Sequence, residues 1–336
     1  MPRRSSISLA DVAAWTNLCE AFWRAARGKR QRPEVACFAA DLEHELARLR
    51  RQILAAELPE GAMVSFEIHD PKRRLIHAPC FRQRVLHHAL MRLMAPVIER
   101  SLVSDTFACI PGRGTLAAVR RAQRHARRNP WYAKIDVETY FGRIEHERLL
   151  TDLARRFKDR GLLALCQRVI AQYTTSSGRG LPIGALTSQH FANLYLGPLD
   201  RHLLERARVA GMVRYMDDTL WWGHGRAAVR QQLQEVVEFL AEQRGLTVKP
   251  NWQINRSVHG APFCGFRVFP DTLRLSLRRK RRYRHARRSW ECAYNQGAVT
   301  SAGLQRAYAG VLAITAHANA RGWRRGELEA RPAPEA

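Results

Sequence analysis

The sequence lacks several features that would place the chain in a common class of protein. It has no uninterrupted apolar run of about 18 residues, so no membrane span is expected. Its seven cysteines form no C-x-x-C pair and their number is odd, which favours reduced thiols in the cytoplasm over disulfides or structural zinc. No G-x-S-x-G, P-loop or H-E-x-x-H motif occurs, and the histidines offer no rival catalytic or zinc site.

Acidic residues are also scarce. Thirty Asp and Glu face 56 Lys and Arg, which gives a formal net charge of +26. A field of this size and sign attracts a polyanion, most often a nucleic acid, although a merely basic, solvated surface is the simpler alternative. The 336 residues, 46% of them hydrophobic, are enough for two or three packed units, so disorder throughout is excluded.

Hydrophobic periodicity divides the chain into regions. Residues 1–60 have helical spacing, and residues 61–270 interleave strands and helices without a regular βαβ order. Residues 271–325 are helical and very basic, and the polar end at 326–336 is expected to be disordered. This pattern predicts an α+β fold with a mixed, largely antiparallel sheet and a helical end.

The stretch "VRYMDDTLWWGHG" places Asp217 and Asp218 side by side between two apolar runs. A buried carboxylate is costly unless a cation meets it, and neighbouring strand residues point to opposite faces unless they occupy a hairpin turn. "AKIDVETYF" supplies another carboxylate, Asp136, on an apolar strand. Carboxylates so placed can hold the two Mg²⁺ ions of nucleotidyl transfer. In the alternative, Asp217 caps a turn and Asp136 pairs with an arginine.

Four motifs occur in a recognisable order: "KIDVETYF", "GLPIGALTSQHFANLYLGPLD", "YMDD" and "FCGFRVF". Over about residues 71–270 they resemble the ordered motifs of reverse transcriptases. The resemblance implies a right-hand polymerase fold, with fingers and palm in 61–270 and an α-helical thumb in 271–325. It also implies RNA-templated DNA synthesis with two Mg²⁺ ions, for which Mn²⁺ is expected to substitute.

The resemblance assigns roles to individual residues. Asp136, Asp217 and Asp218 match the catalytic aspartates, and the backbone of Val137 is also placed at the metal ions. The residues matched to nucleotide binding are Lys72, Arg74, Phe141, Ile183, Gly184, Gln189 and Lys249. Those matched to primer and template are Tyr215, Met216, Phe263, Gly265, Arg278, Arg279, Lys280 and Arg281.

Some of these assignments also have a physical basis. A forked guanidinium at Arg74 suits a triphosphate, whereas the resemblance alone matches Phe141 to the bulky residue that excludes a ribose 2′-hydroxyl. The arginines after Leu277 suit contacts with a nucleic-acid backbone, although a disordered basic arm would have the same composition. "FCGF" around Gly265 matches the primer grip, or is a plain core strand with a glycine bulge.

The segment "LPIGALTSQ" indicates a subgroup. Many reverse transcriptases have glutamine and proline where this chain has Ile183 and Gln189, and the form seen here is similar to that of diversity-generating retroelements, whose enzymes copy RNA with errors at adenine. We hypothesise that Ile183 removes a hydrogen-bonding check on the incoming nucleotide; simple packing is the alternative. Gly142, Arg143 and Gln83 depart from the usual pattern and weaken the subgroup assignment.

The sequence therefore predicts a cytoplasmic bacterial RNA-directed DNA polymerase, the error-prone enzyme of a diversity-generating retroelement. Its expected partners are a template RNA, the cDNA/RNA hybrid, dNTPs and a small basic accessory protein, with no membrane. One alternative is a stand-alone antiphage-defence, retron or intron-type reverse transcriptase. The other is a catalytically silent RNA-binding protein with the same fold.

Overall fold

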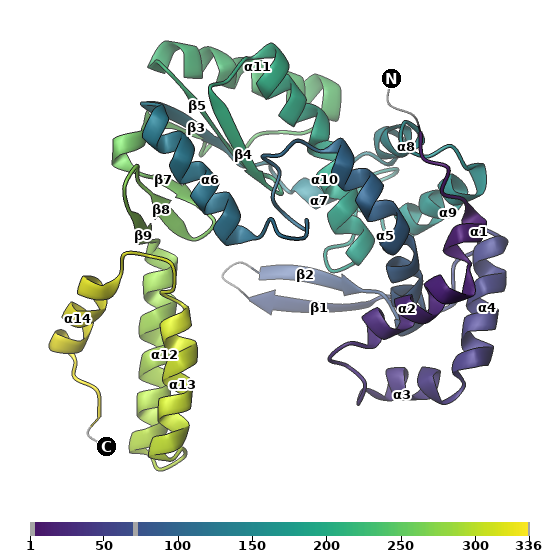
Figure 1. Cartoon of the computed structure of the whole chain (residues 1–336), viewed down its shortest axis with the longest axis horizontal. Helices are drawn as coiled ribbons and strands as arrows, with labels where there is room; N and C mark the ends of the chain where they lie inside the picture. The colour runs from purple at the N-terminus through teal and green to yellow at the C-terminus, as the bar shows by residue number, and fades with distance from the viewer. Residues whose placement is uncertain (1–3, 70–72, 335–336) are drawn as a thin grey trace. The chain divides into compact units, whose positions relative to one another are not determined.

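The structure is a computed structural model that describes residues 4–69 and 73–334 (Figure 1). The chain forms two compact units, each assembled from three separate segments. The first unit contains Met1–Ser104, Val137–His202 and Glu235–Lys249, and the second contains Asp105–Asp136, Leu203–Gln234 and Pro250–Ala336. The division into fingers, palm and thumb stays a prediction.

The first unit is mainly helical. Its helices are α1 (Leu9–Val12), α2 (Trp15–Ala26), α3 (Pro33–Ala40), α4 (Leu42–Leu54), α5 (Phe81–Ser101), α7 (Tyr140–Arg143), α8 (His146–Ala154), α9 (Arg160–Ala171) and α10 (Leu186–Arg201). Its hairpin pairs β1 (Val64–His69) with β2 (Arg73–Ala78) in antiparallel register. The helical periodicity before residue 60 and the two strands predicted after it are confirmed, and the turn predicted between the strands lies outside the described residues.

Helices α2 and α5 pack together at the centre of this unit. The buried Asn17 side chain of α2 donates to the Ala89 carbonyl of α5 at 3.1 Å, which satisfies a polar group inside an apolar contact. Phe22, Phe38 and Phe81 meet nearby, with ring centroids 5.2–6.1 Å apart. Burial of these rings fixes α2 and α3 on the long helix α5.

The second unit is built on a four-stranded sheet. The strand order is β4 (Gly211–Tyr215), β5 (Asp218–Gly223), β3 (Trp131–Ile135) and β6 (Gln253–Arg256), and all three pairings are antiparallel. Helix α6 (Thr115–Arg128) covers one face with Ala118, Val119, Ala122 and Ala126, which pack against Tyr132 and Trp222 in one apolar cluster. The α+β class predicted from the sequence is confirmed.

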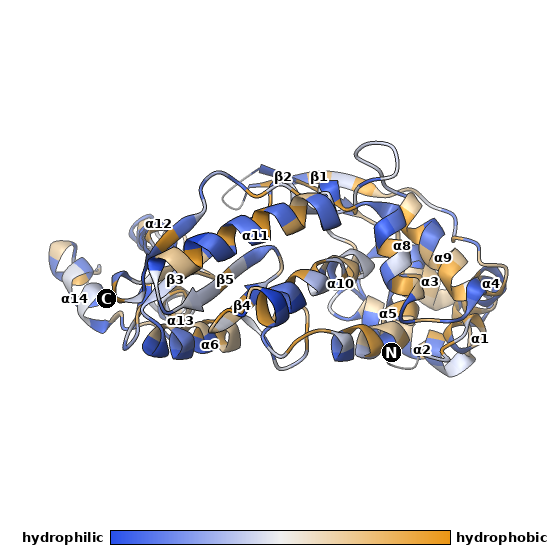
Figure 2. Ribbon diagram, turned by 90° about the horizontal axis from the view of Figure 1, so that it is seen from above, coloured by the Kyte–Doolittle hydropathy of each residue, from blue (hydrophilic) through white to orange (hydrophobic). Residues whose placement is uncertain are grey.

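The remaining elements complete this unit. They are the π-turn η1 (His202–Arg206), the 3₁₀ turn η2 (Ser257–His259), the small antiparallel sheet β7 (Ala261–Phe263), β8 (Phe266–Val268) and β9 (Leu273–Leu275), and the helices α12 (Leu277–Asn295), α13 (Ser301–Ala313) and α14 (Arg321–Ala330). Helix α11 (Arg226–Arg244) runs from the second unit into the first. Figure 2 shows hydrophobic and hydrophilic residues alternating along α11, as expected from its amphipathic sequence.

A buried ion pair holds α12 against its neighbours. Arg287 Nε lies 2.5 Å from Glu291 Oε1, and the Tyr308 hydroxyl donates to the same carboxylate at 2.6 Å. Arg284 donates to Glu327 of α14 at 2.7 Å. Because these contacts anchor α14, the helix continues to Ala330, past the boundary at 325 where the sequence suggested that order ends.

Among the described residues, no helix is both long enough and apolar enough to cross a membrane.

Acid is expected to destabilise the first unit through His87. This residue lies inside α5, and burial, with the nearby His88 charge, lowers its pKa from 6.5 to about 4. A folded-state pKa below the unfolded value means that the stability is complete above pH 6.5 and is lost as the pH falls towards 4. We expect a loss of roughly 3 kcal/mol over this window.

Urea unfolding at pH 7.5 and pH 4 measures this effect. His87→Leu keeps an apolar side chain of similar size in the core and should lose correspondingly less stability on acidification than the wild type. The exposed His69→Gln variant is the control and should behave like the wild type. An equal acid loss in His87→Leu and the wild type would contradict the prediction.

Candidate active site

Asp217 occupies a tight hairpin turn at one end of the four-stranded sheet. Tyr215 at the end of β4 pairs with Asp218 at the start of β5, so Met216 and Asp217 are the two turn residues. Met216 has φ 56°, in the left-handed region that is costly for a long side chain. The sequence did not decide whether a hairpin turn occurs here. The turn allows the two adjacent aspartates to lie at the same end of the sheet.

Asp136 lies one residue beyond the end of β3, next to this turn. Strand β3 pairs with β5 so that Ile135 is opposite Thr219, and the next step of the register brings Asp136 beside the acidic pair. The Asp136 and Asp217 carboxyls share a hydrogen bond. The neighbouring strands β3, β4 and β5 can be followed in Figure 1. The structure therefore brings together the carboxylates predicted from "AKID" and "YMDD".

Burial and Asp136 together raise the pKa of Asp217 to about 7. Burial is the larger cause, because it disfavours the charged form; the hydrogen bond to Asp136 and its negative charge act in the same direction. Two such carboxyls cannot both ionise cheaply without a cation. The site therefore favours either a shared proton or a positive ion.

Asp218 has a different partner. The Lys134 ammonium lies 3.0 Å from an Asp218 carboxylate oxygen and also donates to the Pro262 carbonyl at 2.9 Å. The sequence analysis did not single out Lys134; its signal was a lone lysine in the apolar strand "WYAKI". The ion pair orients Asp218 and compensates its charge.

Arg214 is a second residue that the sequence analysis missed. Its side chain is fully buried in β4, and its guanidinium donates to the Met216 carbonyl at 3.0 Å. Its backbone N–H donates to the Asp105 carbonyl at 2.9 Å, and its carbonyl accepts from Phe107 at 3.0 Å. These bonds support the strained turn from the strand that precedes it.

The donor set fits Mg²⁺. Among the described residues, no group of three or more His, Cys, Asp and Glu side chains is close enough to hold a metal ion alone. Mg²⁺ is commonly bound by one or two carboxylates together with waters and substrate phosphates, so the close pair of Asp136 and Asp217 is sufficient. Val137, the predicted backbone ligand, follows Asp136 directly and pairs with Val248 in an isolated bridge.

The small sheet carries the predicted primer-contacting turn. Cys264 and Gly265 connect β7 and β8 with φ of 46° and 82°. Arg279 of α12 lies over the Phe266 ring at 4.0 Å, and a Cβ at Gly265 would come within 2.9 Å of its Nε. Glycine suits this position because its φ of 82° lies in the left-handed region that other residues rarely adopt. Phe263 is buried in the apolar cluster, so its ring acts in packing.

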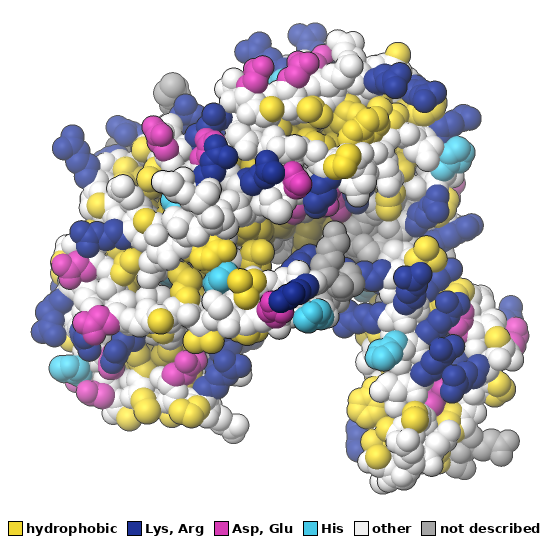
Figure 3. Space-filling view, turned by 180° about the vertical axis from the view of Figure 1, so that it is seen from behind, with side chains coloured by type: hydrophobic (Ala, Val, Ile, Leu, Met, Phe, Trp, Pro, Cys, Tyr) yellow, Lys and Arg dark blue, Asp and Glu magenta, His cyan; other side chains and the backbone are white. Residues whose placement is uncertain are grey.

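The other predicted primer and template residues lie at the surface or close to it. Tyr215 is half-buried and its hydroxyl accepts from Thr115 at 3.2 Å. Arg278 and Arg281 are exposed on α12, and Lys280 lies 5.3 Å from the Trp323 ring centroid. Figure 3 shows Lys and Arg side chains gathered on this helical part of the second unit.

The predicted nucleotide-binding residues lie mainly in the first unit. Some of them belong to, or contact, the short loop that precedes α10. The Ile183 carbonyl accepts from His77 of β2 at 2.8 Å, and the Phe141 carbonyl accepts from Leu181 at 2.8 Å. Gly184 has φ 120°, and a Cβ there would come within 2.7 Å of the Ile76 side chain. Ile183 and Gly184 are thus held against β2, and Phe141 is linked to the same loop through Leu181.

The remaining predicted residues are less closely grouped. Arg74 is exposed on β2, Gln189 is half-buried on α10 and Lys249 follows the bridge residue Val248. Lys72 lies outside the described residues. The structure therefore places Arg74 on the same hairpin as the loop contacts and leaves the roles of all these residues as predictions.

Comparisons with known proteins identify a family and several relatives. Residues 68–258, more than half of the chain, match the family described as "Reverse transcriptase (RNA-dependent DNA polymerase)". Protein YkfC of Escherichia coli (strain K12) is 24% identical over 228 residues, which are 64% of this chain and 55% of YkfC. Nuclear intron maturase 1, mitochondrial, of Arabidopsis thaliana is 27% identical over 97 residues, covering 28% of this chain and 14% of that protein.

A solved structure shares the fold. Telomerase from Candida albicans, in complex with the TWJ fragment of telomeric RNA, aligns with a TM-score of 0.50 and 11% identity, over 86% of this chain and 58% of that one. The right-hand polymerase fold predicted from the sequence is confirmed. The chain spans only about half the length of YkfC and of the telomerase.

Proposed function

The chain belongs to the reverse transcriptase (RNA-dependent DNA polymerase) family, and from this premise we propose that it copies a template RNA into cDNA as a nucleotidyltransferase. The observation that carries the proposal is the hydrogen-bonded, half-buried pair of Asp136 and Asp217 at neighbouring strand ends. A structural turn alone gives no reason to bury two carboxyls together at such a cost.

The three aspartates are proposed to act at the reacting phosphate. Two Mg²⁺ ions, or Mn²⁺ in their place, would activate the attacking hydroxyl and stabilise the departing pyrophosphate. Asp136 and Asp217 would hold them with the backbone of Val137. Asp218, oriented by Lys134 at 3.0 Å, supplies the third carboxylate. Arg214 holds the turn that presents Asp217, through the Met216 carbonyl.

The incoming dNTP is proposed to contact the first unit. Arg74, exposed on β2, would grip the triphosphate with its guanidinium, with Lys72 and Lys249 as further cations. Phe141 would exclude a ribose 2′-hydroxyl by its bulk. Gly184 and Gln189 flank the start of α10, at the position matched to the nucleotide.

The cDNA/RNA hybrid is proposed to bind the basic helical region. Arg278 and Arg281 are exposed on α12 and suit contacts with phosphates, which bind without regard to base sequence. Arg279 and Lys280 also stack on aromatic rings, so they combine a structural role with the positive field. Tyr215, Met216 and the Cys264–Gly265 turn between Phe263 and Phe266 would contact the primer end.

We further propose that the enzyme is the error-prone polymerase of a diversity-generating retroelement. The support is the "IGALTSQ" form, in which Ile183 replaces an amide. Its backbone carbonyl accepts a hydrogen bond from the His77 N–H, a contact that does not involve the side chain. An apolar side chain cannot make a hydrogen bond to a nucleotide, and discrimination would then rest more on shape.

Ile183→Gln is expected to lower misincorporation opposite template adenine by roughly fivefold, because one restored hydrogen bond supplies about 1 kcal/mol. The measurement is sequencing of cDNA made by the purified chain with Mg²⁺, dNTPs and a primed RNA that contains all four bases. Ile183→Leu, which adds no hydrogen-bonding group, should keep the wild-type error spectrum. Accurate cDNA from the wild type would argue against the retroelement subgroup and keep the polymerase.

A second candidate is an intron-type reverse transcriptase. The Arabidopsis relative is named an intron maturase and a yeast relative is named an intron protein, which favours this reading over a retron or a defence enzyme. An activity that needs the chain's own intron RNA, and is indifferent to a small basic accessory protein, would support it. Absence of all synthesis, with RNA binding intact, would favour a catalytically silent RNA-binding protein.

A further inference from the structure

A cavity of about 790 Å³ in the first unit is lined by five arginines and holds no predicted site residue within the described chain. The arginines come from four segments: Arg4 from the N-terminal segment, Arg100 from α5, Arg155 and Arg156 from the end of α8, and Arg201 from α10. The other lining residues are three serines and a valine, so no carboxylate is among those described.

Local structure fixes the cavity walls. The Ser5 N–H donates to the Arg156 carbonyl at 2.7 Å, in a parallel β-bridge between Ser5 and Phe157. This bridge places the N-terminal segment, and Arg4 with it, beside the end of α8. Arg201 donates to the Ser101 carbonyl at 2.9 Å, which ties the end of α10 to the end of α5. The cations are therefore gathered by backbone contacts despite their mutual repulsion.

Arg156 is the central residue of this group. Its Nε is buried, and no hydrogen-bond partner for that atom is found among the described residues. Burial, followed by the charge of Arg201, lowers the pKa of Arg156. The neighbouring carboxylate Asp152 is already bonded to Arg244 and lies 3.5 Å from Arg155. A buried donor left without a partner is costly, and an anion in the cavity would relieve that cost.

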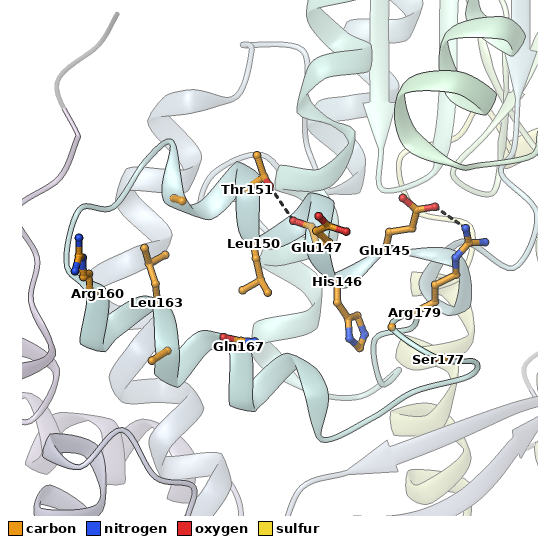
Figure 4. Close-up of a pocket in the computed structure, with 13 residues that line it drawn as sticks. Glu145, His146, Glu147, Leu150, Thr151, Arg160, Leu163, Gln167, Ser177 and Arg179 are labelled. Atoms are coloured by element: carbon orange, nitrogen blue, oxygen red, sulfur yellow. Dashed lines mark hydrogen bonds and ion pairs between the residues drawn. The ribbon is translucent and has the colours of Figure 1, made fainter.

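Another cavity of the same unit has a different character. It has a volume of about 920 Å³ and lies beside α8 and α9 (Figure 4). There Glu145 and Glu147 accompany Arg179 and Arg160 in the lining, and Arg179 lies 2.6 Å from Glu145. Positive charge in that cavity is compensated by the chain itself. The described lining of the arginine-lined cavity has no carboxylate, and Asp152, which lies 3.5 Å from Arg155, is shared with Arg244.

We infer that the arginine-lined cavity is a phosphate-binding site, used either by the backbone of an RNA strand or by a small free polyphosphate. Forked guanidinium groups bind phosphate oxygens in pairs, and several of them around one cavity suit more than one phosphate. The site goes beyond the proposed polymerase reaction, because its residues are not among those assigned to metal, nucleotide, primer or template.

The first arm of the test measures RNA binding. Fluorescence anisotropy of a labelled single-stranded RNA is followed over a range of salt, with the full chain and without dNTPs or divalent metal. Arg100→Gln combined with Arg156→Gln should flatten the slope of log affinity against log salt by about 1.4, since each lost phosphate contact contributes about 0.7. The matched control replaces the exposed Arg226 and Arg230 of α11 by Gln and should change the slope less.

The second arm uses inorganic pyrophosphate, titrated into the same proteins by calorimetry without divalent metal. One saturable binding event is expected in the wild type, weakened about tenfold in the Arg100 and Arg156 double variant and unchanged in the control. Because Arg156 is partly buried, Arg4→Gln combined with Arg100→Gln is tested as well; both of these side chains are exposed and should not affect folding.

The two arms separate the sources of the phosphate. Loss in the RNA arm alone assigns the site to an RNA backbone, and loss in the pyrophosphate arm alone assigns it to small phosphate compounds. Variants that behave like the Arg226 and Arg230 control in both arms overturn the inference. Neither arm measures DNA synthesis, so the result is independent of whether the polymerase proposal holds.

Discussion

Asp217→Asn is expected to lower cDNA synthesis at least a thousandfold while RNA binding stays unchanged. The carboxylate is half-buried beside Asp136, and the amide that replaces it cannot carry the negative charge that a divalent cation requires. Loss of about 4 kcal/mol of transition-state stabilisation corresponds to this factor. The measurement is primer extension on an RNA template with Mg²⁺ and dNTPs, together with anisotropy of the same RNA.

The control for this variant is Asp271→Asn, which changes an aspartate whose side chain is 89% exposed and lies 3.9 Å from Arg127. It should keep wild-type synthesis. A parallel loss of RNA binding in Asp217→Asn would point to misfolding, since nothing in the proposal gives this residue a role in holding RNA. Synthesis within a few fold of the wild type would remove Asp217 from the catalytic residues and with it the support for the polymerase proposal.

Arg244→Met is expected to destabilise the chain by roughly 3–5 kcal/mol, because it leaves the buried Asp152 carboxylate without its main partner. Both side chains are only 7% exposed, and they form a direct ion pair. The Arg244 guanidinium also lies 4.3 Å from the centroid of the Tyr195 ring. Burial raises the pKa of Asp152, and the charge of Arg244 acts against this rise.

Urea unfolding of the full chain at neutral pH measures the loss. Asp152→Leu combined with Arg244→Met removes both charges and should recover a large part of the stability lost in Arg244→Met. The exposed pair of Arg325 and Glu329, 3.9 Å apart, is the control, and Arg325→Met should cost less than about 1 kcal/mol. Equal losses of stability in Arg244→Met and Arg325→Met would show that the buried pair stabilises the chain no more than the exposed pair does.

The candidate site could be predicted from the sequence where it depends on local patterns. Asp136 and Asp217 stand out because each is a carboxylate in an apolar stretch, and strand periodicity lets Asp217 and Asp218 share a surface only at a hairpin turn. Lys134 and Arg214 were missed for the opposite reason. Each is one cation in a chain with 56 Lys and Arg, and only the folded sheet, in which Lys134 lies opposite Leu220, brings its ammonium within 3.0 Å of Asp218.

The fold, like the site, was predictable where it depends on local patterns. Helical spacing before residue 60 and alternation around Phe66 gave the right elements, because both depend on near neighbours in the chain. The composition of the two compact units was not predictable. Each is assembled from three distant segments, and which segments associate depends on long-range contacts, such as that of Arg201 with the Ser101 carbonyl, that periodicity does not encode.

The arrangement of the sheet bears on how the chain folds during synthesis. Strand β3 leaves the ribosome well before β5, and β6, its other neighbour, is made later still. Until then the nascent chain exposes both edges of an apolar strand, which is a state prone to wrong pairing and aggregation. Helix α6, made just before β3 and packed on the same sheet, is available to cover one face of the waiting strand. Yield of the folded protein should therefore depend on chaperones and on the speed of translation between β3 and β6.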